Sequence, residues 1–259
     1  MLCLKVTEVL IKKNSYKKGI PFLMKSIKTI QTCPSQMTSI HQALFKLCLL
    51  AKYPKPALRF LDEDVSDIHD DETSVQDEYY LLYFYYGGMI YCSVGNYSRA
   101  FYCFHSAITL FYHVISDIMV EASKRFILTS LLINQPNAID DENILFIKRI
   151  EEFDSCGPYF NLVEEFKKRN LSSLQSLLLK NETVFVQDKN LGLVKQVINS
   201  LITIKIQNLN KPFKTLSLQD LAAKVGISDV NEAEKFMFQM VCFRFRFINI
   251  ILILIIINY

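Results

Sequence analysis

The sequence predicts a mainly α fold in which an array of helical repeats is followed by a smaller helical module. The chain has only 7 Gly and 7 Pro in 259 residues, which favours long helices over the many tight turns of a sandwich or barrel. One stretch in the first half has the spacing of a known helix-pair repeat. A second stretch near the C-terminal end has the pattern of a helix–turn–helix.

The clearest repeat lies between residues 84 and 107. Aromatic and small residues occupy the positions of one tetratricopeptide-type (TPR-like) helix pair there, namely Phe84, Gly87, Gly88, Tyr91, Tyr97, Ala100, Phe104 and Ala107. A Gly inside a helix costs about 1 kcal/mol relative to Ala, so close approach of two helices is the expected compensation. Because such a unit needs stacked neighbours, we expect a right-handed TPR-like superhelix over residues 1–187.

Residues 1–31 are expected to be helical, with a turn near Asn14-Ser15 and Gly19. Lysines are spread along this stretch, at Lys12, Lys13, Lys17, Lys18, Lys25 and Lys28. A run of this kind usually indicates a solvated helical face. The alternative is a surface for an acidic partner.

The next predicted elements lead into the repeat. Ser39–Tyr53 is expected to be an amphipathic helix that ends before Pro54, and Pro56 lies in the first turn of the next helix. Nine acidic residues between 62 and 78 predict an exposed loop. The tyrosine-rich run 79–86 covers all sides of a helix, so that helix should pack on both faces.

Further helices are predicted after the repeat. They span Val114–Asn134, Asp140–Phe153, Pro158–Asn170, Ser172–Asn181 and Asn190–Leu209. The last of these has an apolar stripe at helical spacing and ends before Pro212. Short connections between successive helices are consistent with a repeat array.

The sequence changes character after Pro212. Phe213–Leu216 is expected to be extended, and Ser217–Asp220 forms a capping box that opens a helix over Leu218–Val225. Gly226 is a predicted C-terminal cap, and a second capping box opens Val230–Met240. This order of elements, namely helix, short strand, helix, turn and helix, is that of the first half of a winged helix. Residues 188–240 should therefore contain the end of the array and a partial winged helix.

A helical array followed by a winged helix resembles the PCI-domain family, which supplies scaffold subunits to the proteasome lid, the COP-nine signalosome and a translation initiation factor. Several strings resemble the subunit-three family of the COP-nine signalosome in particular. They are HQALFKLCLLAK (41–52), KPAL (55–58), YYGGMIY (85–91), GLVKQ (192–196) and TLSLQD (215–220). The resemblance covers about residues 20–240, with the PCI domain at about 80–240.

The resemblance implies a function. The signalosome removes the ubiquitin-like protein NEDD8 from cullin-ring ubiquitin ligases, and its chemistry belongs to a different, zinc-dependent subunit. A member of this family is expected to be a non-catalytic scaffold in the cytoplasm and nucleus, with other PCI subunits as partners and cullin-ring ligases as indirect ones. The expected partner interface is the edge of the winged helix, including Lys195, Phe213, Thr215, Leu216 and Leu218. The alternative is a PCI subunit of another complex.

The chain departs from the family pattern at both ends. Family members look longer before Met1, and the wing strands and closing helix expected after Met240 are absent. Without those strands we expect poor assembly. The apolar tail 241–259 has three interpretations. It could be a membrane span, for which it is short, or a replacement strand at a sheet edge. We favour the third, a gene-model error or intron read-through. A spliced message that reads straight through Met240 would refute the favoured one.

No catalytic, cofactor or metal motif was found in the sequence. The four histidines have neither a His-x-His nor a His-Glu-x-x-His spacing, and the seven cysteines form no Cys-x-x-Cys pair. Nucleic-acid binding by the winged helix is the main rival hypothesis. The net charge of only +3, and Asp229, Glu232 and Glu234 beside Lys235 in the would-be recognition helix, argue against it.

Overall fold

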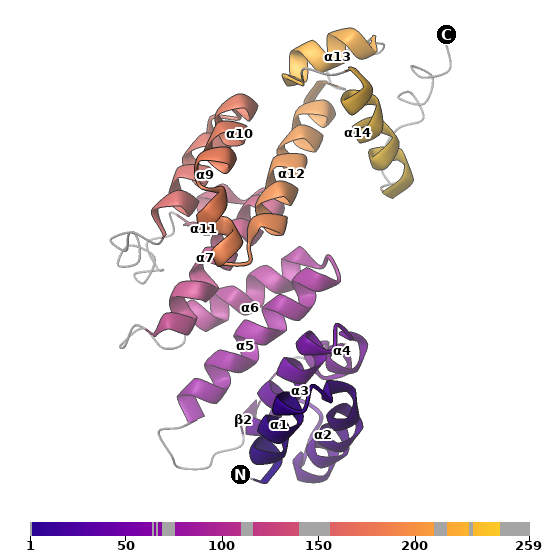
Figure 1. The fold of residues 1–259 in the computed structure, drawn as a ribbon, viewed down its shortest axis with the longest axis vertical. Helices are drawn as coiled ribbons and strands as arrows, with labels where there is room; N and C mark the ends of the chain where they lie inside the picture. Colours follow the sequence, from indigo (N-terminus) through magenta and orange to yellow (C-terminus); the bar gives the residue numbers. More distant parts are fainter. Residues whose placement is uncertain are drawn as a thin grey trace. The chain divides into compact units, whose positions relative to one another are not determined.

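The structure, a computed structural model, describes residues 2–63, 65, 67–68, 76–109, 116–139, 156–209, 217–227 and 230–243. This part of the chain is almost entirely helical, which confirms the predicted mainly α fold (Figure 1). The chain divides into two compact units, residues 1–157 and 158–259. Among the described helices, none is long and apolar enough to cross a membrane.

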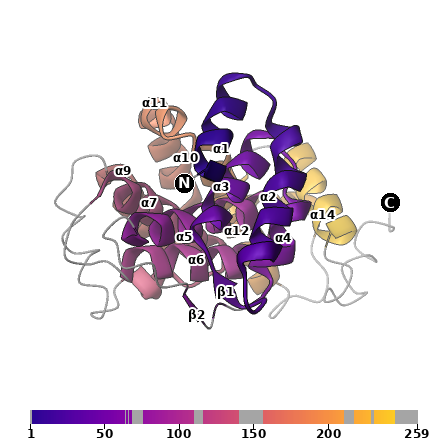
Figure 2. The same ribbon diagram turned by 90° about the horizontal axis from the view of Figure 1, so that it is seen from below.

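The first unit is built around helices α3 and α5, against which the other helices pack. Its elements are α1 (Leu2–Lys12), α2 (Tyr16–Ile30), α3 (Ser39–Leu50), α4 (Lys55–Leu61), α5 (Gln76–Ser93), α6 (Tyr97–Thr109), α7 (Asp117–Leu132) and the short 3-10 helix η1 (Pro136–Ile139). Two-residue strands, β1 (Gln36–Met37) and β2 (Asp67–Ile68), pair in parallel, as seen from below in Figure 2.

The predicted turn is present at Asn14-Ser15, but Gly19, which was assigned to the same turn, lies outside it. Asn14 has φ 52°, the left-handed conformation that ends α1. Gly19 instead lies inside α2, where a Cβ atom would lie 2.6 Å from Cδ1 of Leu10 and 2.7 Å from Cδ1 of Leu47. The missing side chain therefore serves close helix packing rather than a change of direction.

The second unit consists of shorter helices followed by one long helix and a helix–turn–helix. They are α9 (Gly157–Lys167), α10 (Leu171–Lys180), α11 (Glu182–Gln187), α12 (Leu191–Leu209), α13 (Leu218–Val225) and α14 (Val230–Phe243). The bounds of α13 are those predicted, and Gly226 follows it with φ 87°, as a C-cap glycine does. The sequence analysis missed α11.

Several predictions fall outside the described residues. They are the helix Asp140–Phe153, the extended segment Phe213–Leu216, most of the acidic segment 62–78 and the tail beyond residue 243. The division at residue 187, between repeats and winged-helix region, stays a prediction.

His41 illustrates how tightly the start of α3 is packed. Its ring is buried, and Thr38 N–H donates to its Nδ1 over 3.0 Å in a capping box that closes the helix N-terminus. The rings of Phe60 and Tyr83 lie 5.4 and 5.9 Å from it, centroid to centroid. Burial lowers the pKa of His41 from 6.5 to about 4, so the imidazole is neutral in the folded protein at pH 7.

This lowered pKa predicts a loss of stability on acidification. The stabilisation is fully present above about pH 6.5, where unfolded His41 is also neutral, and it is lost as the pH falls towards 4. Thermal unfolding should be followed between pH 7.5 and 5, so that the range extends more than about one unit below the pKa of a free histidine. Over this range Tm should fall more steeply for the wild type than for His41→Gln. Identical pH slopes in the two proteins would contradict this assignment.

Candidate interaction surface

Helices α5 and α6 form an antiparallel pair joined by a short turn (Figure 1). Gly95, with φ 77°, lies in this turn, and nothing lies within 4 Å of the position of its missing Cβ. A position with positive φ favours Gly, because Gly has no Cβ atom and adopts this conformation without steric strain. The pair coincides with the repeat at residues 84–107.

The two helices approach closely because small residues lie at their crossing. A Cβ atom on Gly88 would lie 2.6 Å from Cε1 of Phe104, whose ring is fully buried. On Gly87 it would lie 2.8 Å from Cδ2 of Leu61, in α4. Ala100 and Ala107 are also fully buried. The two glycines thus let α5 approach a large ring on one neighbour and a leucine on another.

Tyr91 ties α5 to the end of α4. Its hydroxyl donates to the backbone oxygen of Leu61 over 2.7 Å and lies 3.0 Å from Oδ1 of Asp62. Burial raises the pKa of Tyr91, and the Asp62 carboxylate raises it further. The neutral phenol therefore acts as a structural donor in this position.

The other aromatic residues of α5 point to more than one neighbour. Tyr80 and Tyr83 are buried, whereas Phe84 and Tyr85 are half-buried, as is Tyr97 at the start of α6. Helix α5 contacts α3, α4, α6 and α7. This arrangement fits a helix that is apolar on all sides because it has neighbours on all sides.

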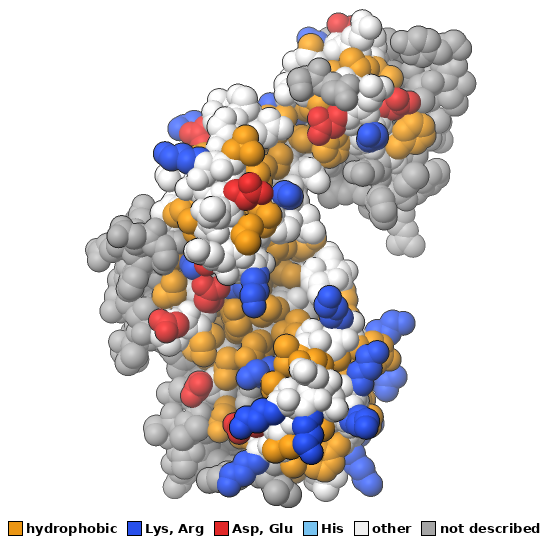
Figure 3. All heavy atoms as spheres, viewed as in Figure 1, with side chains coloured by type: hydrophobic (Ala, Val, Ile, Leu, Met, Phe, Trp, Pro, Cys, Tyr) orange, Lys and Arg blue, Asp and Glu red, His pale blue; other side chains and the backbone are white. Residues whose placement is uncertain are grey.

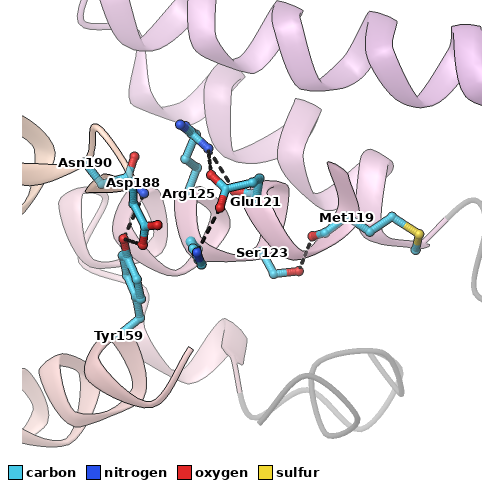
Figure 4. Close-up of polar contacts among 8 residues, drawn as sticks. Met119, Glu121, Ser123, Arg125, Tyr159, Asp188 and Asn190 are labelled. Carbon is cyan, nitrogen blue, oxygen red and sulfur yellow. Dashed lines mark hydrogen bonds and ion pairs between the residues drawn. The ribbon is translucent and has the colours of Figure 1, made fainter. Parts of the chain in front are cut away.

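Helix α7 carries a buried charge cluster that the sequence analysis missed. Glu121 lies 2.8 Å from Nζ of Lys124 and 2.9 Å from a guanidinium nitrogen of Arg125 (Figure 4). The Arg125 guanidinium also lies 5.3 Å from the centroid of the Tyr85 ring. Both cations are buried, and a buried cation is tolerated when it is paired, so this cluster has a structural role.

A second polar cluster lies in the other unit and joins its helix ends. The Tyr159 hydroxyl donates to Oδ2 of Asp188 over 2.7 Å and accepts from Nδ2 of Asn190 over 3.0 Å (Figure 4). Asn190 is fully buried, and its Oδ1 has no partner among the described protein atoms. The hydroxyl thus connects α9 to the loop between α11 and α12.

Polar contacts at the ends of α13 define the helix–turn–helix. Ser217 Oγ accepts from the N–H of Asp220 over 3.1 Å and donates to its carboxylate over 2.7 Å. At the other end, Nζ of Lys205 from α12 donates to the backbone oxygen of Val225 over 2.9 Å, and burial lowers the pKa of Lys205. A cation at a helix C-terminus stabilises the carbonyl groups that end there.

The predicted interface residues are only partly visible. Lys195 is exposed on α12, and Leu218 is half-buried at the start of α13. Phe213, Thr215 and Leu216 lie outside the described residues, so the interface stays a prediction. In the part of the chain that the structure describes, no group of three or more His, Cys, Asp and Glu side chains could hold a metal ion.

Comparison with known proteins finds two family matches and named relatives. Residues 1–136 match the family described as COP9 signalosome complex subunit 3, N-terminal helical repeats, and residues 174–242 match the PCI domain. A Drosophila melanogaster protein named COP9 signalosome complex subunit 3 is 36% identical over 254 residues, covering 92% of this chain and 57% of that protein. An Arabidopsis thaliana protein of the same name is 30% identical over 241 residues, with coverages of 93% and 55%. The chain spans little more than half the length of these relatives.

Gly88→Ala should destabilise the protein. Overpacking against the buried Phe104 ring costs about 1–3 kcal/mol, more than the gain of about 1 kcal/mol in helix propensity from Gly to Ala. Urea unfolding followed by circular dichroism measures the difference. The matched control is Gly192→Ala in α12, where a Cβ meets nothing within 4 Å and stability should stay the same or rise. A rise in both variants would show that the α5–α6 crossing is not tight.

Tyr159→Phe should lower the free energy of unfolding of the second unit by about 1–3 kcal/mol, because Asp188 and Asn190 lose a buried partner. The control is Tyr16→Phe, whose hydroxyl also donates, over 2.6 Å to Asn14, but at an exposed site. It should change stability by less than about 0.5 kcal/mol. If the two substitutions lowered the free energy of unfolding equally in the same urea titration, the buried cluster would contribute no more to stability than an exposed hydrogen bond does.

Proposed function

The chain belongs to the family of COP9 signalosome complex subunit 3, and on this premise we propose that it is a non-catalytic scaffold subunit of the signalosome. The observation that carries the proposal is the combination, in one chain, of a closely crossed repeat hairpin and a capped helix–turn–helix within the PCI match. Both are packed helical modules that present an exposed surface to other proteins. Repeat arrays of this kind bind other proteins along their exposed faces.

The second unit offers apolar side chains for such contacts. Val186, on α11, is 54% exposed, and Phe238, on α14, is 51% exposed. Large apolar side chains at these exposures are what a subunit covers when it packs against neighbours. We infer that PCI subunits are the neighbours and that Lys195 and Leu218 belong to their interface.

In this proposal the chain supports the removal of NEDD8 from cullin-ring ligases, and so regulates ubiquitin-dependent protein degradation, in the cytoplasm and nucleus. The contact with cullin-ring ligases is indirect, and the chemistry belongs to a different subunit. Nucleic acid is not a partner. Helix α14 exposes Glu232 together with Lys235, a charge balance that phosphate does not favour. Tight duplex binding at physiological salt would contradict this part.

The proposal predicts that the chain enters a complex when co-expressed with the other signalosome subunits, although to a smaller extent than a full-length subunit 3, in line with the poor assembly expected from the sequence. The double substitution Lys195→Glu and Leu218→Asp should reduce its share in the purified complex about tenfold, as loss of central contacts does. Asp is favourable in the first turn of a helix, so Leu218→Asp should leave α13 folded. Quantitative mass spectrometry of the tagged complex gives the readout.

Lys180→Glu, at an exposed site at the end of α10, is the control and should leave incorporation unchanged. The scaffold proposal fails if the wild-type chain stays outside the complex while the other subunits assemble. It also fails if the purified chain alone releases NEDD8 from a modified cullin.

A further inference from the structure

We propose that the outer face of the α1–α2 helix pair binds an acidic peptide segment of another protein, one that also carries apolar side chains. This basic face is defined by Lys12, Lys13, Lys17, Lys18 and Lys25, with Phe22 at its edge. The proposal goes beyond the scaffold function and involves neither the winged-helix region nor the predicted interface there.

Charge is segregated along the chain. Residues 1–63 contain only the carboxylates Glu8, Asp62 and Glu63, against the cations Lys5, Lys12, Lys13, Lys17, Lys18, Lys25, Lys28, Lys46, Lys52, Lys55 and Arg59. Because the whole chain has a net charge of only +3, the remainder is net acidic. Figure 3 shows Lys and Arg side chains gathered over the N-terminal helices with few Asp or Glu among them.

The lysines of α2 share one face of the helix. At about 100° per residue, Lys17, Lys18, Lys25 and Lys28 fall within an arc of about 100°. The buried residues of α2 occupy the opposite arc and pack towards α3, namely Gly19, Ile20, Leu23 and Ile27. The charged face is therefore directed to solvent by the same packing that holds the helix in place.

The charge is densest where α1 turns into α2. Lys12, Lys13, Lys17 and Lys18 flank the turn at Asn14, and all four are exposed. Neither they nor Lys25 forms an ion pair with a carboxylate of the described residues. Like charges at this spacing repel one another, so the free surface gains stability when an anion covers it.

Exposed apolar side chains among the lysines decide what kind of anion fits. Phe22 is 44% exposed and lies at the edge of the lysine arc, about 40° around α2 from Lys18, and Val9, on α1, is 50% exposed. The phosphate backbone of a duplex has no apolar group that could cover these side chains, whereas a peptide that mixes Asp and Glu with Phe and Leu contacts both the lysines and the apolar side chains.

A membrane surface fits the face less well than a peptide does. An interfacial helix buries a broad apolar face in the lipid. In α2 that face is already taken up by Ile20, Leu23 and Ile27 inside the protein, and the exposed apolar side chains Phe22 and Ile30 do not make up a broad second face. The peptide is thus the occupant that the charge and the exposed side chains favour together.

The test uses the full chain and a labelled synthetic peptide in which Asp-Glu pairs alternate with Phe and Leu. Fluorescence anisotropy should show binding that weakens as salt rises, because exposed charges are screened within about 10 Å at 0.1 M salt. The variant Lys17→Glu/Lys25→Glu should lose about tenfold in affinity. The control Lys180→Glu/Lys235→Glu makes the same change in net charge at exposed sites of the other unit and should retain wild-type affinity.

Phe22→Ser should weaken binding of this peptide and leave binding of a peptide with Ser in place of Phe and Leu unchanged. Equal losses in the test and control variants would reduce the effect to net charge and overturn the proposal. So would preferential binding of a single-stranded oligonucleotide or of phosphatidylserine vesicles at the same salt, or absence of peptide binding. Failure here leaves incorporation into the signalosome as a separate result, since the co-expression variants lie elsewhere.

Discussion

The packing of the first unit depends on how closely α5 approaches its neighbours, which the missing side chains of Gly88 and Gly87 allow. Gly88 admits the buried ring of Phe104 from α6, and Gly87 admits Leu61 from α4. Tyr91, one turn further along α5, then fixes the end of α4 by its hydroxyl. Contacts that share one closely packed helix are energetically coupled, so a change at the α5–α6 crossing should also affect the other neighbours of α5.

Buried polar groups give this packing its specificity. In the first unit Glu121 holds two buried cations of α7, and in the second the Tyr159 hydroxyl holds Asp188 and Asn190. The Tyr159 cluster joins α9 to the loop between α11 and α12, so a displaced helix there would leave a buried donor or acceptor unsatisfied. The Tyr159 cluster therefore fixes the position of α9 against the start of α12. The ion pairs of α7 lie within one helix and compensate the burial of its two cations.

Local signals in the sequence were sufficient where the cause of the structure is itself local. The capping pattern Ser217–Asp220 with Gly226 predicted α13 with its observed bounds, and the spacing of small and aromatic residues located the α5–α6 pair. Prediction was wrong at Gly19 because a glycine that relieves a distant contact, here with Leu47, has the same local pattern as one that makes a turn. Lys124 and Arg125 were missed since the spacing of Glu121, Lys124 and Arg125 is typical of exposed helix pairs, and their burial depends on neighbours far away in sequence.

Amide hydrogen exchange of the full chain, wild type against Gly88→Ala, tests the central claim most directly. If the α5–α6 crossing holds the first unit together, the substitution should lower protection in α3, α6 and α7 together, with the second unit unchanged. Loss of protection confined to the residues next to position 88 would contradict this account, because it would show that the crossing is one contact among many.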